Sequence, residues 1–257
     1  MCINSIKIQK LQNTPLENKK IFYKGNLSLL EKPIVAIVGS RKPNTYAKTY
    51  THKIAQQLSH AGVIVISGGA IGVDAIAHKA VGAENTIMVA ATGLDKRYPA
   101  INKSLIEEIE QKGLVLSQFE TGTPSQRYNF PLRNQLIVAL ADAVVVTYAD
   151  LNSGSMRSVE YALKLKKPLY VLPHRLGESE GTNELLQQEK AQPIYDIESF
   201  VQKFGKVNSK KGTDPFLEYC ATNPTYEEAV AKYGAKVSME ELRGTIYIRN
   251  GIVFPAL

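Results

Sequence analysis

The chain contains no tryptophan and only two cysteines among its 257 residues. Cys2 and Cys220 stand near opposite ends, with neither the spacing of a metal site nor that of a redox motif, so we expect no bound metal. No apolar run approaches the roughly 18 residues of a membrane span, and the first residues, MCINSIKIQK, lack the apolar core of a signal peptide. We therefore expect a cytoplasmic protein with no membrane partner.

Motifs for nucleotide chemistry are also missing. The chain has no GxxxxGK(S/T) phosphate loop and no GxGxxG dinucleotide fingerprint, because the residues after Ile66 read SGGAIG. Its four histidines are scattered and form no Ser-His-Asp order. Asp74 and His78 are spaced for an acid–base pair, but an acid in the first turn of a helix more commonly complements the helix dipole. We expect no catalytic residues, no cofactor and no enzymatic activity.

Short apolar runs alternate with helical patterns along most of the chain. The runs are too short for helices, and most are rich in Val and Ile on both faces, like strands buried on both sides of a parallel sheet. The expected strands are Ile34–Val38, Val63–Ile66, Thr86–Ala91, Leu114–Ser117, Ala143–Thr147 and Leu169–Leu172. The expected helices are Thr45–His60, Val73–Val81, Asn102–Lys112, Leu132–Ala141 and Ser155–Lys166. This alternation predicts an α/β fold with a doubly wound, mostly parallel sheet.

The pattern changes after Phe204. Residues 206–214, KVNSKKGTD, are polar and lysine-bearing, which is typical of a linker. Three short helical patterns follow, and then two short strands around Arg249-Asn250-Gly251, a hairpin signal. We predict a lead-in (1–20), a sheet domain (21–205), a linker (206–214) and a small winged-helix-like domain (215–257).

The formal net charge of +7 favours an anionic partner. Residues 205–257 contain seven basic and six acidic residues, so six of the seven net charges belong to the preceding residues. Ligands bind outside the carboxyl ends of the strands in an open α/β sheet, so the loops after the strands should converge there. These loops carry Arg41, Lys42, Lys96, Arg97, Arg127, Arg133, His174 and Arg175. Together with glycine-rich turns that expose backbone amides, they predict an extended anion-binding edge.

The segment Arg127–Asn134, RYNFPLRN, alternates cations with aromatic residues. Such mixtures bind single-stranded nucleic acid, because arginines contact phosphates and each base stacked on an aromatic ring contributes roughly 1–3 kcal/mol. The same spacing fits a structural role in which Phe130 seals the core beneath the following helix and Arg133 caps or pairs locally. The residues alone leave both interpretations open.

Seven segments, taken together and in order, resemble the DNA-processing protein A (DprA/Smf) family. They are IFYKGNLSLL, IVAIVGSRKP, VIVISGGAIGVDAIAHKA, TIMVAATGLDKRYP, NFPLRN, SGSMRSVEYAL, and PLYVLP followed by EGTNELL, between about residues 21 and 200. The resemblance implies an extended Rossmann-like domain that binds single-stranded DNA during natural transformation. It also implies protection of incoming DNA, loading of the RecA recombinase and a homodimer, and it leaves double-stranded DNA open as a ligand.

The resemblance implies which residues bind DNA. The family's Gly-Ser/Thr-Arg motif falls on Gly39, Ser40 and Arg41, its Phe and Arg-Asn pair on Phe130, Arg133 and Asn134, and a basic position on Arg127. The expected DNA-binding set is Gly39, Ser40, Arg41, Gly68, Gly69, Arg127, Asn129, Phe130, Arg133 and Asn134. In this interpretation the arginines contact phosphates, Phe130 meets a base, and the glycines allow close approach of the DNA backbone.

Two departures from the family pattern bear on this expectation. Gln135 stands where the family commonly has a second arginine, and the N-terminal helical domain of many members is expected to be absent. An alternative is a nucleotide phosphoribohydrolase of the lysine-decarboxylase-like type, which shares the fold and a Gly-Gly-x-x-Gly loop. That class requires a catalytic glutamate where Ser158 stands, and Glu160 comes two positions later on a different helix face.

Overall fold

The structure, a computed structural model, describes residues 4–206 and 214–255. The chain divides into two compact units, Met1–Val207 and Asn208–Leu257, here called the large unit and the small unit. Each unit has its own hydrophobic core. The expected linker, 206–214, lies outside the described residues except for its two end positions.

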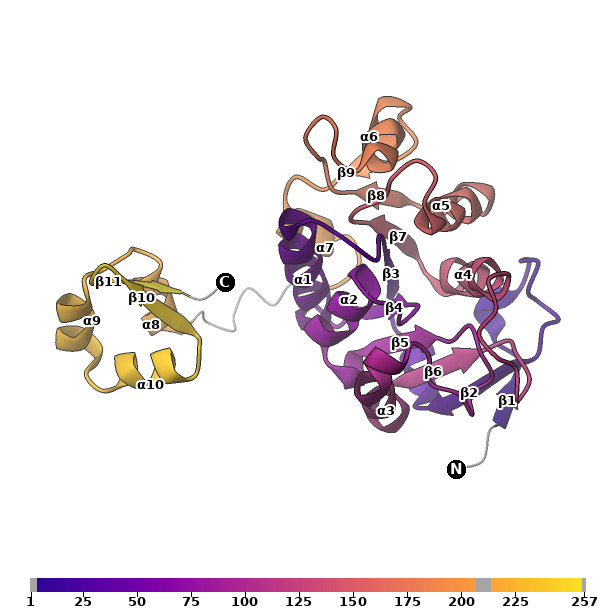
Figure 1. Cartoon of the computed structure of the whole chain (residues 1–257), viewed down its shortest axis with the longest axis horizontal. Helices are drawn as coiled ribbons and strands as arrows, with labels where there is room; N and C mark the ends of the chain where they lie inside the picture. Colours follow the sequence, from indigo (N-terminus) through magenta and orange to yellow (C-terminus); the bar gives the residue numbers. More distant parts are fainter. Residues whose placement is uncertain (1–3, 207–213, 256–257) are drawn as a thin grey trace. The chain divides into compact units, whose positions relative to one another are not determined.

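A nine-stranded sheet forms the centre of the large unit (Figure 1). The strands are β1 (Asn4–Ile6), β2 (Ile21–Gly25), β3 (Ile34–Val38), β4 (Ile64–Ser67), β5 (Thr86–Val89), β6 (Leu114–Ser117), β7 (Ala143–Val146), β8 (Leu169–Val171) and β9 (Gln192–Pro193). Their order across the sheet is β1-β2-β6-β5-β4-β3-β7-β8-β9. β2 runs antiparallel to β1 and to β6, and all other neighbouring pairs are parallel.

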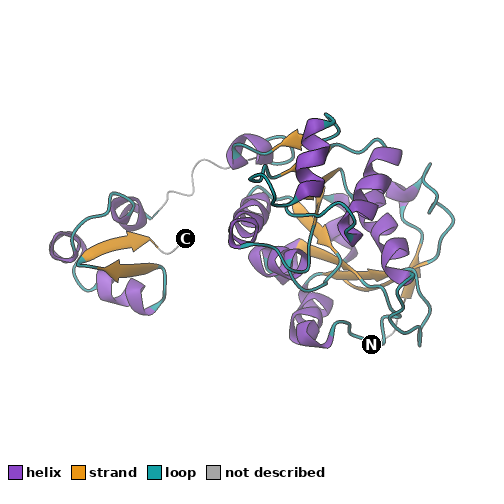
Figure 2. Cartoon of the chain, turned by 45° about the horizontal axis from the view of Figure 1, so that its top comes forward, coloured by secondary structure: helices purple, strands orange, loops and turns teal. Residues whose placement is uncertain are grey.

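Helices cover both faces of this sheet (Figures 1 and 2). One face carries α1 (Thr45–His60), α2 (Val73–Val81), α3 (Lys103–Lys112) and α7 (Ile197–Val201). The other carries α4 (Asn129–Leu140), α5 (Gly154–Lys164) and α6 (Glu180–Gln187). Short 3₁₀ helices occupy Gln9–Leu11, Leu27–Glu31, Ala83–Asn85 and Ala100–Asn102. The expected α/β class with a doubly wound, mostly parallel sheet is confirmed.

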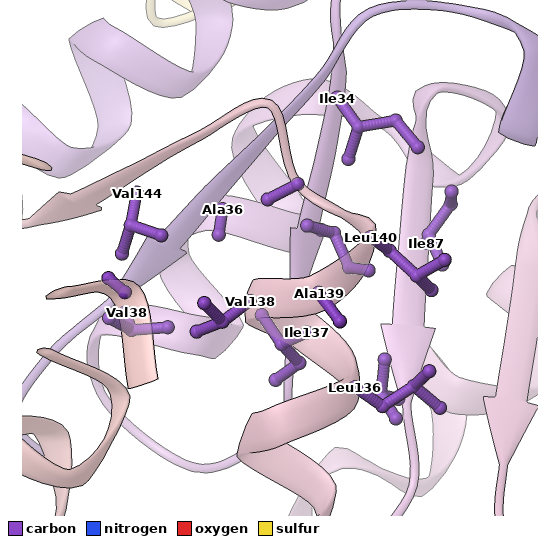
Figure 3. Packing of buried hydrophobic residues seen from close by; sticks show 14 of the residues in the cluster. Ile34, Ala36, Val38, Ile87, Leu136, Ile137, Val138, Ala139, Leu140 and Val144 are labelled. Atoms are coloured by element: carbon purple, nitrogen blue, oxygen red, sulfur yellow. The ribbon is translucent and has the colours of Figure 1, made fainter. Parts of the chain in front are cut away.

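Strand β3 shows why these residues form a central strand. All five of its side chains are buried. Ile34, Ala36 and Val38 pack with the apolar side chains of α4, as Figure 3 shows. Val35 and Ile37 point to the opposite face, where they pack with α1 and α2. A run of Val, Ile and Ala without polar alternation is stable only when both faces of the strand are covered.

The strand order creates a switch point beside β3. From β3 the chain continues through β4, β5 and β6 on one side and then returns to β7 on the other side of β3. The loops that follow β3 and β7 therefore lead away in opposite directions, which opens a crevice at the carboxyl edge of the sheet. The Ser40 amide donates a hydrogen bond to the Tyr148 carbonyl at 2.8 Å, so the two loops are joined at the base of this crevice.

The small unit consists of three helices followed by a hairpin. Its elements are α8 (Pro215–Cys220), α9 (Tyr226–Tyr233), α10 (Lys236–Leu242), β10 (Ile246–Arg249) and β11 (Ile252–Pro255). Phe216, Cys220 and Val253 are fully buried in its core. Thr225 and Glu228 form a capping box at the start of α9. The expected small winged-helix-like domain is confirmed as a fold.

Several elements differ from the sequence-based expectation. The helix expected at Leu132–Ala141 begins at Asn129, with Pro131 as its third residue, where a missing N–H removes no intrahelical hydrogen bond. Strands β1 and β2 and helices α6 and α7 were not predicted. Leu11 and Leu16, in the expected lead-in, are buried in the large unit's core. Within residues 4–206 and 214–255, no helix has both the length and the apolar character that crossing a membrane requires.

Candidate functional site

A groove of about 510 Å³ lies at the switch point, between the loop after β3 and the start of α5. It is lined by Val38, Gly39, Ser40, Arg41, Ala70, Asp74, Tyr98, Arg127, Phe130, Pro131, Arg133, Asn134, Ile137, Ser153, Gly154, Ser155, Arg157 and Ser158. Four arginines and one carboxylic acid contribute to this lining. A groove with this lining attracts anions, and its size exceeds that of a single phosphate.

Seven of the ten expected DNA-binding residues line this groove. They are Gly39, Ser40, Arg41, Arg127, Phe130, Arg133 and Asn134. Gly68 lines a smaller adjoining pocket of about 70 Å³. Gly69 and Asn129 are buried and line neither.

Arg133 is buried, with only 5% of its surface exposed. Its Nη1 donates to the carbonyl oxygens of Gly68 and Val89, the latter at 2.9 Å, and its Nε donates to Asn134 Oδ1 at 2.9 Å. These bonds tie α4 to the ends of β4 and β5. The local structural role considered for Arg133 is therefore present, and Arg133 is also a lining residue of the groove.

Packing inside the protein explains the glycines of the expected site. A Cβ at Gly68 would lie 2.0 Å from Arg133 Nη1. Gly69 has φ +72°, and a Cβ there would lie 2.7 Å from Met88 Sδ. At Gly39 it would lie 2.7 Å from Val73 Cγ2. These three glycines thus give room to neighbouring side chains of the same chain, a role that the sequence does not reveal.

Asn129 also has an internal role. Its side-chain amide donates to the carbonyl oxygens of Ala91 and Pro124, each at 3.0 Å. These bonds anchor the first turn of α4 to the loops after β5 and β6. Asn129 therefore positions Phe130, the next residue, at the groove.

Phe130 is half-buried and lies close to two guanidinium groups. Arg41 Cζ lies 5.4 Å from the Phe130 ring centroid and Arg133 Cζ lies 6.0 Å from it. The ring of Tyr98 is 5.9 Å away, centroid to centroid. All four residues line the adjoining small pocket, which is therefore an aromatic slot with cationic walls. Such a slot suits a flat, electron-rich group.

Residues at the start of α5 also line the groove, although none of them is in the expected DNA-binding set. They are Ser153, Ser155, Arg157 and Ser158, which line the same groove as Arg41. In the sequence, the segment SGSMRS supports the family resemblance, and its Ser158 counts against the phosphoribohydrolase alternative. Its place directly after a central strand was the available signal, because helices that follow such strands begin at the ligand-binding edge.

Asp74 and His78 are both buried and serve the structure. Asp74 Oδ2 accepts a hydrogen bond from the Ala70 amide at 3.3 Å, which closes the SGGA turn. Burial raises the pKa of Asp74, and the nearby Arg133 cation opposes that shift. Burial lowers the pKa of His78 to about 3. The Thr86 hydroxyl donates to the Val65 carbonyl, so His78 Nδ1 donates to Thr86 Oγ1 at 2.6 Å.

The residues required by the phosphoribohydrolase alternative are not assembled. Ser158 lines the groove, whereas Glu160 is exposed and pairs with Arg157 Nη1 at 3.0 Å. Gln135 lines a separate cavity of about 100 Å³ with Leu16 and Tyr161 and is not part of the groove lining. The backbone position at which the family commonly has a second arginine is therefore outside the groove in this chain. In the described part of the chain, no group of three His, Cys, Asp or Glu side chains is placed to hold a metal ion.

Residues 7–205 match the family of DNA recombination-mediator protein A. Among curated proteins, Protein Smf of Synechocystis sp. is 39% identical over 160 residues, which are 60% of this chain and 40% of the relative. DNA processing protein DprA of Streptococcus pneumoniae is 37% identical over 172 residues, which are 65% of this chain and 61% of the relative. The chain thus spans between about two fifths and three fifths of the length of these relatives.

Two solved structures are similar over most of the chain. DNA processing protein A from Helicobacter pylori, whose single-stranded DNA binding mode has been described, is 41% identical with a TM-score of 0.73. The alignment covers 78% of this chain and 94% of that one. DprA from Streptococcus pneumoniae is 33% identical with a TM-score of 0.73, covering 79% and 75% of the two chains.

Proposed function

The chain belongs to the DNA recombination-mediator protein A family, and from this premise we propose that it binds single-stranded DNA in natural transformation. We propose further that it protects incoming DNA in the cytoplasm and helps to load the RecA recombinase onto it. The observation that carries the DNA-binding proposal is the switch-point groove, which has four arginines beside a half-buried phenylalanine. The Helicobacter pylori relative with a described single-stranded DNA binding mode supports it.

The groove residues divide into contacts and supports. Arg41 and Arg127 are exposed and line the groove, so in this proposal they contact phosphates. Ser40 and Asn134 line the groove near them and supply polar contacts. Arg133 is held by internal hydrogen bonds and lines the groove. In this proposal it adds positive charge to the groove without a direct phosphate contact.

Phe130 provides the surface for a base. Phe130 is half-buried, and both Arg41 and Tyr98 lie close to its ring and line the same slot. A base that enters the slot either displaces the Arg41 guanidinium from the ring or stacks beside Tyr98. In both cases the contact needs an unpaired base, and this requirement favours single-stranded over duplex DNA.

The test is the affinity for oligo-dT measured across a range of salt concentrations. We expect log–log salt dependence with a slope of about −0.7 per phosphate neutralised. Arg41→Ala should weaken binding and flatten that slope by about one such step. Lys190→Ala removes the same charge from an exposed residue outside the groove lining and serves as the control. Absence of detectable binding by the folded protein at low salt would refute the proposal.

The proposed partners are RecA and a second copy of this chain. Both follow from family membership, and the groove supports neither directly. Light scattering on the purified protein tests the homodimer. RecA filament formation on single-stranded DNA, with and without this protein, tests loading, and an unchanged filament yield would contradict it.

A further inference from the structure

The first turn of α5 presents hydrogen-bond donors to the groove. The helix is 11 residues long, and its N-cap, Ser153, makes no side-chain capping bond. The first N–H groups of a helix have no acceptor within the helix, so those of Gly154 and Ser155 are available. A Cβ added at Gly154 would meet nothing within 4 Å, so a ligand can approach the backbone at this point.

Two serine hydroxyls at the same place have no partner. Ser158 is fully buried, lines the groove, and has an Oγ without a hydrogen-bond partner among the described residues. The Oγ of Ser153 is likewise buried and unpaired in the described part of the chain. Buried hydroxyls are normally hydrogen-bonded, so two unpaired ones on residues that line one groove point to a ligand. Both serines lie in a segment separate from Arg127–Asn134, so they are an independent observation on the same groove.

The donor set identifies the chemistry of that ligand. Backbone amides, two hydroxyls and the Arg157 guanidinium can all donate, and Arg157 lines the same wall. An acceptor-rich anion satisfies such a set, and a phosphate group with its non-bridging oxygens matches a helix N-terminus. Arg157 is exposed and pairs with Glu160 at 3.0 Å, so it is free to turn toward the ligand at the cost of a surface ion pair.

We propose that the N-terminus of α5, with Ser153, Ser158 and Arg157, is a phosphate-binding site in the groove that Arg41 also lines. This inference deepens the proposed function, and it rests on that function only for the source of the phosphate. The site holds either an internal phosphodiester of the strand or a terminal phosphate monoester. A bound strand then has phosphate contacts at two places in the groove, at Arg41 and at the N-terminus of α5.

The decisive variant is Ser158→Ala. Without ligand it should be at least as stable as the wild type, because it removes an unpaired buried hydroxyl. Its affinity for oligo-dT should nevertheless fall about three- to tenfold, with an unchanged salt slope because no charge is lost. Ser153→Ala should behave in the same way. Arg157→Gln should flatten the salt slope, whereas Lys190→Gln and Ser104→Ala, both at exposed residues outside the groove lining, should change neither quantity.

The source of the phosphate is separated by comparing oligo-dT with and without a 5′-phosphate. A loss in Ser158→Ala that is equal for both assigns the site to a phosphodiester, and a loss confined to the phosphorylated strand assigns it to the terminal group. Thermal stabilisation by inorganic phosphate or thymidine 5′-monophosphate, lost in Ser158→Ala, supports the site even if the protein fails to bind oligo-dT. Wild-type DNA affinity and wild-type phosphate response in both serine variants would overturn the site and leave the proposed function intact.

Discussion

Arg133 is the residue that links the framework of the large unit to its groove. Its guanidinium donates hydrogen bonds to two backbone carbonyls and to the side chain of Asn134. Gly68 is shaped by this arginine, because any side chain at Gly68 would occupy the space of the guanidinium. Gly68, which the sequence predicts to be a ligand-binding residue, is therefore explained by the space that the Arg133 guanidinium requires.

A substitution at Gly68 tests this explanation. Gly68→Ala places a methyl group 2.0 Å from Arg133 Nη1, and we expect a loss of about 2–4 kcal/mol in the free energy of unfolding, since a buried hydrogen-bonded cation must move. Gly154→Ala is the matched control, because its Cβ meets nothing within 4 Å, and it should be neutral or stabilising. Urea titration measures both. Equal stabilities of the two variants would contradict the role given to Arg133.

His78 gives the large unit a pH-dependent stability. Its pKa in the folded chain is about 3, below the ordinary 6.5. Below pH 6.5 the unfolded chain therefore binds a proton at His78 that the folded chain does not bind. The part of the free energy of unfolding that is linked to His78 is fully present above pH 6.5 and is lost as the pH falls toward about 3. Between pH 7.5 and 5.0 the wild type should lose about 2 kcal/mol more than His78→Asn.

The comparison at His78 is made by urea unfolding at the two pH values. Asp74 acts in the opposite direction, because burial raises its pKa, but it is present in both proteins and cancels in the difference. The exposed His52→Asn variant should keep the wild-type pH dependence. A His78→Asn variant with the wild-type pH dependence would show that His78 is not the group responsible.

At the level of elements, the central strands were predictable because burial on both faces leaves an unbroken apolar run. Ile34–Val38 and Leu114–Ser117 were predicted with the bounds that the structure has. β2 was missed because it is held by antiparallel pairing with β6, about 90 residues later, and its own sequence carries no sign of that partner. Helix α7 has only five residues, too few to show a helical period.

The groove was predictable only in part. The edge of the sheet and the cations after β3 and in Arg127–Asn134 followed from loop positions, because parallel strands end at one edge. The burial of Asn129 and Arg133 did not, since spacing does not distinguish an arginine that faces solvent from one that bonds to carbonyl oxygens. The residues at the start of α5 were not in the predicted binding set, because the donors there are mainly backbone amides and two serines and not a cluster of cations.

At the scale of the whole molecule, the groove belongs to the large unit alone. All its lining residues lie between Val38 and Ser158, and the small unit has a separate core. We propose that residues 21–205 form the DNA-binding domain together with the lead-in, joined by the linker 206–214 to a small winged-helix-like domain, 215–257.

A chain that ends after residue 206 tests this division. It should keep the wild-type affinity for oligo-dT within about twofold, since neither the groove nor the described core of the large unit includes residues of the small unit. The binding curve is read beside a thermal melt that verifies folding. A folded fragment with at least tenfold weaker binding would place DNA contacts in the small unit.

We propose that the groove binds unpaired bases at Phe130 and phosphates at its arginines. The most direct measurement compares single-stranded and duplex DNA in salt-titrated binding, with the wild type and Phe130→Ala. We predict a selective loss of single-strand affinity worth about 1–3 kcal/mol, with an unchanged salt slope. Equal affinities of the folded variant and the wild type for both DNA forms would contradict the claim and leave Phe130 a structural residue.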